Sequence, residues 1–164
     1  MIHFDRVAAD EADLTAAPAD DDVTTIGLHN KTGVTLATVL TVPDGKVVYI
    51  LDGTTLETDS GSKDLTVEGI VYVEADAVLD TSAGKVAVKE TGRVHVLKAG
   101  TLTVATALSV NDGATPSAAT VLGTGKVAIG GALAYTGTRC GCYRSGACLC
   151  GERRHTRSND EARA

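Results

Sequence analysis

Large aromatic side chains are almost absent from this chain. Its 164 residues include one Phe, four Tyr and no Trp, although 43% of them are apolar. The core must therefore consist of Val, Leu, Ile and Ala. The stacked aromatic platform that binds single-stranded nucleic acids is not expected. The apolar content excludes compositional disorder, and the length predicts about one domain.

Positive charge and long apolar runs are scarce too. Fifteen Lys and Arg stand against 21 Asp and Glu, which gives a net charge of −6. This charge disfavours binding to a phosphate backbone, so we expect no nucleic-acid partner. No apolar run reaches the roughly 18 residues of a membrane-spanning helix. The N-terminus also lacks the basic and apolar regions of a secretory signal, so no membrane partner is expected.

The distribution of charge divides the chain into three parts. Residues 1–22 form an acidic arm, residues 23–138 a β-domain, and residues 139–164 a tail that carries Cys and six Arg but no Lys. A short helix is expected within residues 7–14, and Pro18 would end it. The arm is either a solvated terminus or a segment that becomes ordered on a partner. In the second case Met1, Ile2 and Phe4 form an apolar hook for docking.

The β-domain contains short β-branched runs between turn residues, which indicates strands throughout. Apolar and polar residues alternate: Val94 and Val96 share one face, and His95 lies on the other. This pattern is typical of half-buried antiparallel strands, and we predict an all-β sandwich or barrel without a repeat of fixed period. The expected strands are Val23–His29, Val34–Val42, Lys46–Leu51, Leu65–Glu74, Lys85–Lys89, Arg93–Leu97, Thr101–Val110 and Lys126–Tyr135.

Catalytic patterns are missing. His29 and His95 are the only histidines of the β-domain, and neither has a nucleophile pattern beside it. Gly123 and Gly125 lack the following helix that a dinucleotide-binding loop requires, so they are interpreted as turn residues. The sequence therefore predicts a scaffold or interaction module, not an enzyme.

The four cysteines all lie in the tail, as Cys140, Cys142, Cys148 and Cys150. In a hairpin with a five-residue loop, Cys142 faces Cys148 and Cys140 faces Cys150. The period of a strand places all four sulfurs on one face. They could bind Zn²⁺ as tetrahedral thiolates, form two cross-strand disulfides, or remain free thiols. One residue separates the cysteines of each pair, whereas structural zinc sites usually have two to four.

Between residues 65 and 134 a series of short motifs occurs in a fixed order. They are Val67-Glu68-Gly69-Ile70-Val71-Tyr72-Val73, Gly92-Arg93-Val94-His95-Val96 with Ala99-Gly100, Ala107-Leu108-Ser109-Val110-Asn111-Asp112, Thr115-Pro116-Ser117-Ala118 and Val127-Ala128-Ile129-Gly130-Gly131-Ala132-Leu133-Ala134. This series resembles the small β-rich decoration, or cement, proteins of tailed bacteriophages and archaeal tailed viruses. The resemblance implies a compact β-tulip-like or barrel-like domain on the outer capsid surface, made in the host cytoplasm. Its partners would be the major capsid protein and further copies in a homotrimer, and no catalytic residues are implied.

Two other functions remain open at this point. One is a tail, fibre or adhesin module that binds a receptor or a glycan. The other is a metal–thiolate protein in which the β-domain presents the cysteine cluster.

Overall fold

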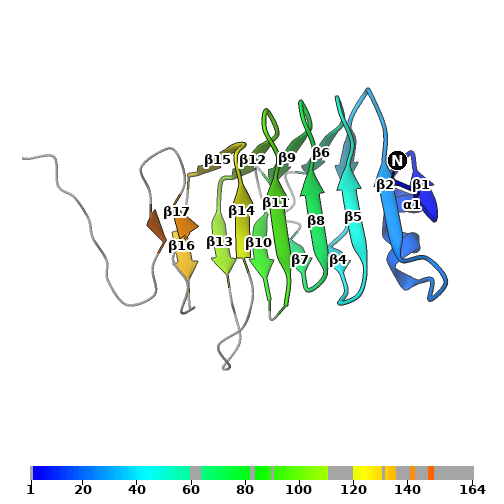
Figure 1. Cartoon of the computed structure of the whole chain (residues 1–164), viewed down its shortest axis with the longest axis horizontal. Helices are drawn as coiled ribbons and strands as arrows, with labels where there is room; N and C mark the ends of the chain where they lie inside the picture. The colour runs from blue at the N-terminus through cyan, green and yellow to red at the C-terminus, as the bar shows by residue number, and fades with distance from the viewer. Residues whose placement is uncertain are drawn as a thin grey trace, which may run out of the picture.

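The computed structural model describes residues 2–59, 64–81, 84–89, 91–110, 120–130, 132–135, 141–142 and 148–149. The β-domain is a solenoid in which each coil contributes one strand to each of three parallel sheets, here called sheets A, B and C (Figure 1). A separate antiparallel pair joins β17 (Gly141–Cys142) to β18 (Cys148–Leu149).

The strands of each sheet follow one another in chain order. Sheet A contains β1 (Arg6–Ala8), β2 (Thr25–Leu28), β5 (Val47–Ile50), β8 (Ile70–Val73), β11 (Arg93–Val96) and β14 (Thr120–Gly123). Sheet B contains β3 (Val34–Leu36), β6 (Thr55–Thr58), β9 (Val78–Thr81), β12 (Thr101–Val104) and β15 (Lys126–Ile129). Sheet C contains β4 (Leu40–Val42), β7 (Leu65–Val67), β10 (Lys85–Val88), β13 (Ala107–Val110) and β16 (Ala132–Tyr135).

The all-β class is confirmed, but the antiparallel sandwich or barrel is replaced by parallel pairing. Val47 pairs with Ile70, and Ile70 pairs with Arg93, so two successive coils are 23 residues long each. The expectation that the sequence has no repeat was therefore wrong. Alternation misled the prediction because a solenoid strand, like an antiparallel one, has one buried and one exposed face.

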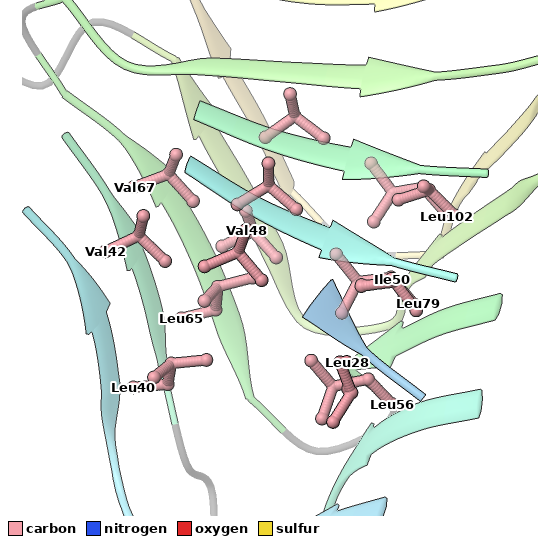
Figure 2. Close-up of a cluster of buried hydrophobic side chains, with 14 of the residues drawn as sticks. Leu28, Leu40, Val42, Val48, Ile50, Leu56, Leu65, Val67, Leu79 and Leu102 are labelled. Atoms are coloured by element: carbon pink, nitrogen blue, oxygen red, sulfur yellow. The ribbon is translucent and has the colours of Figure 1, made fainter. Parts of the chain in front are cut away.

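The core lies inside the solenoid and consists of inward-facing aliphatic side chains. In the four-residue strands from β2 to β13, the second and fourth residues are buried, as Val48 and Ile50 are in β5. Figure 2 shows such residues from different coils and sheets packed against one another. Full burial of one Val, Leu or Ile side chain contributes about 1.5–3 kcal/mol, so these stacked rows dominate the stability of the fold.

The N-terminal segment forms a cap on one end of the solenoid. Its strand β1 pairs in parallel with β2, and its helices are α1 (Glu11–Ala16) and the 3₁₀ helix η1 (Ala17–Ala19). Leu14 of α1 is fully buried in the same core as the coils. The extended acidic arm expected from the sequence is therefore replaced by a folded cap. Its apolar residues cover the first coil, whose inner side chains would otherwise face water.

Several acidic residues of the cap act as hydrogen-bond acceptors. Oδ1 of Asp10 accepts from Asp13 N and caps α1. Oδ2 of Asp5 accepts from the backbone N–H groups of Thr24 and Thr25, at 3.0 and 2.8 Å. Oε1 of Glu11 accepts from the N–H groups at residues 37 and 38, at 2.7 and 2.9 Å. Asp5, Asp10 and Glu11 thus serve local structure, whereas Asp20, Asp21 and Asp22 are exposed.

Candidate interaction surface

The outer face of sheet A carries a row of stacked rings. Tyr49, Tyr72 and His95 occupy equivalent outward positions of β5, β8 and β11, because the register pairs each with the next. The ring centroids of Tyr49 and Tyr72 lie 4.6 Å apart with an interplanar angle of 11°. Those of Tyr72 and His95 lie 4.8 Å apart at 21°. The spacing matches the distance of about 4.8 Å between neighbouring strands, so the sheet itself sets the stack.

Phe4 extends this row toward the N-terminus. Its ring meets Tyr49 edge-on, with centroids 5.4 Å apart. It lies over Gly27, where an added Cβ would come within 3.0 Å of the Phe4 ring. The ring thus fills the outward position that Gly27 leaves empty on β2. Of the residues expected to form a docking hook, Phe4 packs on its own domain, Ile2 is 51% exposed, and Met1 lies outside the described residues.

Aliphatic side chains flank the row of rings on both sides. Val47 and Ile70 lie at the N-terminal margin of the strands, and Leu51 and Leu97 follow the C-terminal ends. Leu97 is 40% exposed, and the others are half-buried. We call this surface the ladder face. It consists of Phe4, Val47, Tyr49, Leu51, Ile70, Tyr72, His95 and Leu97.

Charge on the ladder face is confined to its two margins. Arg93 begins β11 and is exposed, whereas Glu74 directly follows β8 at the opposite margin. Burial, with Arg93 nearby, lowers the pKa of His95 below its ordinary value of 6.5. Burial, together with Tyr72 and Glu74, raises the pKa of Tyr49. At neutral pH the row is therefore made of uncharged rings.

The other two faces of the solenoid differ in composition. The outward positions of sheet B include Thr35, Glu57 and Asp80, and Thr35 Oγ1 donates to Glu57 Oε1 at 2.8 Å. Those of sheet C include Thr66 and Ala87. Only sheet A presents a continuous apolar surface among the described residues.

The row of rings was not predicted from the sequence, although the sequence contains a signal for it. The segments Val47-Val48-Tyr49-Ile50, Ile70-Val71-Tyr72-Val73 and Arg93-Val94-His95-Val96 recur at a constant spacing. An aromatic ring stands at the third position of each. Aligning them would have indicated parallel coils and a stack of rings.

The cysteine tail is described only in part. The backbone pairing of β17 and β18 sets Cys142 opposite Cys148, which is the register that the hairpin prediction requires. Cys140 and Cys150 lie outside the described residues. No group of three or more His, Cys, Asp or Glu that could hold a metal occurs in the described ranges, and the zinc site stays a prediction.

The two histidines of the β-domain lie on different coils of the solenoid. His95 has its imidazole stacked on Tyr72, and His29 is exposed at the end of β2. Within the part of the chain that the structure describes, no helix has the length and apolar character needed to cross a membrane. Comparison with family models, with curated proteins and with solved structures finds no match.

Proposed function

We propose that this protein is a non-catalytic structural module that decorates the outer surface of a virus capsid. It binds the major capsid protein and further copies of itself. The observation that supports this role is the ladder face, an apolar surface set on a stiff parallel scaffold. Contiguous apolar surfaces of this kind are typical of protein–protein interaction sites.

A decoration protein gains from rigidity and repetition. The rings of neighbouring coils stack on one another, so their side chains are already ordered. Binding would therefore require little further ordering of side chains. On a symmetric shell, many equivalent weak contacts add through avidity, and no single contact has to be strong. Two of the motifs that resemble decoration proteins contain Tyr72 and His95 of the ladder face.

A glycan-binding role is less well supported by the same geometry. Sugars bind to aromatic residues by stacking on an open ring face. In the row, Tyr72 has Tyr49 on one side and His95 on the other, so both of its faces are occupied. The rings present their edges outward, which suits packing against an apolar protein surface.

The test is the copy number of this chain in purified virus particles from the source host, counted by mass spectrometry against the major capsid protein. A decoration protein is expected at a number comparable with that of the capsid subunit. A few dozen copies or fewer would instead indicate a tail, vertex or fibre component. Complete absence would refute every virion role.

Metal binding by the tail is a second candidate, favoured by the pairing of Cys142 with Cys148. If Cys140, Cys142, Cys148 and Cys150 hold one ion together, elemental analysis should give close to one Zn per chain. Cys142→Ser should remove that zinc, because three thiolates bind it less tightly. Metal-free protein with four titratable thiols would contradict this candidate.

A further inference from the structure

We infer that the ladder face is the contact surface between two copies of this chain, which dock face to face about a twofold axis. This inference assigns a twofold dimer where the resemblance implied a homotrimer, and it does not depend on the proposed capsid role. It concerns the isolated protein in solution.

The fold leaves apolar surface uncovered on the outer side of sheet A. Four large apolar residues of the described chain are well exposed, and two of them, Val7 at 56% and Leu97 at 40%, lie on the outer side of sheet A. Val7 pairs with Gly27 and so continues the row of rings at its N-terminal end. Apolar side chains therefore extend from β1 to β11 without a charged residue in the row.

The row extends over five strands of sheet A, from β1 to β11. At about 4.8 Å between strands and about 3.3 Å per residue over five residues, its face covers roughly 400 Å². Two such faces bury about 800 Å², a size typical of weak and transient contacts, so we expect a reversible dimer.

The charges at the two margins of the ladder face are opposite in sign. Arg93 and Glu74 lie on neighbouring coils but at opposite margins of the row. A twofold axis parallel to the row exchanges the two margins between copies. Arg93 of each copy then approaches Glu74 of the other, offset by one strand spacing, while the rings meet in the centre. A face that carries one charge of each sign on opposite sides is thus complementary to itself, as a twofold contact requires.

The experiment is sedimentation of the full chain over a concentration series, with reductant present so that association through the cysteines is excluded. Wild-type protein is expected to pass from monomer to dimer. Arg93→Glu and Glu74→Arg should each weaken the dimer by about tenfold or more, because like charges then face each other. The double variant, which restores opposite charges, should recover most of the association.

Lys85→Glu is the matched control. Lys85 is an exposed outward residue of a strand in the same solenoid, but it lies on sheet C. Its charge reversal should leave the dimer unchanged, and circular dichroism melts should show that all variants fold. The inference is overturned by a monomer at every concentration, by a trimer, by equal weakening with Lys85→Glu, or by a double variant that stays dissociated. Since no capsid is present, none of these results bears on the particle count.

Discussion

At the scale of single residues, two buried threonines in the core differ in how their hydroxyls are satisfied. Thr58 and Thr81 end equivalent strands of sheet B and are buried among aliphatic side chains. Thr81 Oγ1 donates to the carbonyl of Thr103 at 3.2 Å. Thr58 Oγ1 has no hydrogen-bond partner in the described part of the chain. Burying an unsatisfied hydroxyl costs about 1–3 kcal/mol, so Thr58 is a local weakness of the core.

Replacement of Thr58 by Val should therefore stabilise the protein by about 1 kcal/mol, since the unsatisfied oxygen is removed and the shape is kept. Thr81→Val is the control. It loses a hydrogen bond together with the hydroxyl and should be close to neutral. Urea denaturation of both variants measures the difference. Equal effects of the two substitutions would contradict the assignment.

Gly27 and Phe4 form a second residue-level pair. In Gly27→Ala the new Cβ would lie 3.0 Å from the Phe4 ring, so the ring must move away. We expect a loss of about 1 kcal/mol, although alanine is otherwise favoured over glycine in a strand by about 0.5–1 kcal/mol. With Phe4→Ala already present, Gly27→Ala should become neutral or stabilising. A double-mutant cycle by thermal denaturation tests this coupling, and strictly additive effects would exclude it.

Alternation in the sequence identified which residues face inward. Val94 and Val96 were expected to share one face, and both are fully buried. It could not identify neighbours across coils. The contacts among Phe4, Tyr49 and Tyr72 depend on the register of strands that are far apart in sequence, which a local pattern does not contain.

At the scale of elements, the corners of the solenoid explain most of the difference between expectation and structure. Val34–Val42 was expected as one strand, but residues 37–39 form a corner between β3 and β4. Thr101–Val110 is likewise divided at residues 105–106. These corners contain neither Gly nor Pro, so the sequence looks continuous and suggests a long strand in a sandwich. At the first corner, Glu11 of the cap accepts the free N–H groups, which is a tertiary effect.

The cap predicts a pH dependence that can be assigned to one carboxylate. Hydrogen bonds from Thr25 and Thr24 lower the pKa of Asp5 below its ordinary value of 3.8. Its contribution to stability is therefore present above the unfolded pKa and is lost as the pH falls through the lower, folded pKa. As the pH falls below about 5, Asp5→Asn should lose less stability than the wild type.

Thermal melts of both proteins across this range test the assignment of Asp5. Asp21→Asn is the control, because the Asp21 carboxylate accepts no hydrogen bond from the residues that the structure describes. This substitution should leave the loss of stability at acid pH unchanged. If stability fell equally steeply with decreasing pH in wild type and in Asp5→Asn, groups other than Asp5 would hold β1 in place.

At the scale of the whole molecule, the solenoid is a nearly one-dimensional stack. Each coil pairs with the coil before and the coil after it, and the cap covers the first coil. Because each strand bonds only to its neighbours in the same sheet, stability should accumulate coil by coil. The sequence alone predicted the all-β class and one β-rich domain. It did not predict the stack of coils. The repeat concerns a few equivalent positions in each coil, and these positions are not occupied by identical residues.

This architecture predicts that one whole coil can be removed without loss of the fold. Deletion of residues 70–92 joins Gly69 to Arg93 and lets β11 pair with β5 in the register that β8 now uses. The inner rows stay aliphatic, since Val94 and Val96 would stack on Val48 and Ile50. The shortened chain should keep the β-sheet circular dichroism signal per residue and melt cooperatively at a lower temperature, because one set of coil contacts is lost. Deletion of residues 70–81 alone is the control, because it would place the sheet C strand Lys85–Val88 where a sheet A strand belongs, and it should prevent folding. If both deletions destroyed the β-sheet signal equally, the coils would not be interchangeable units and the one-dimensional description would fail.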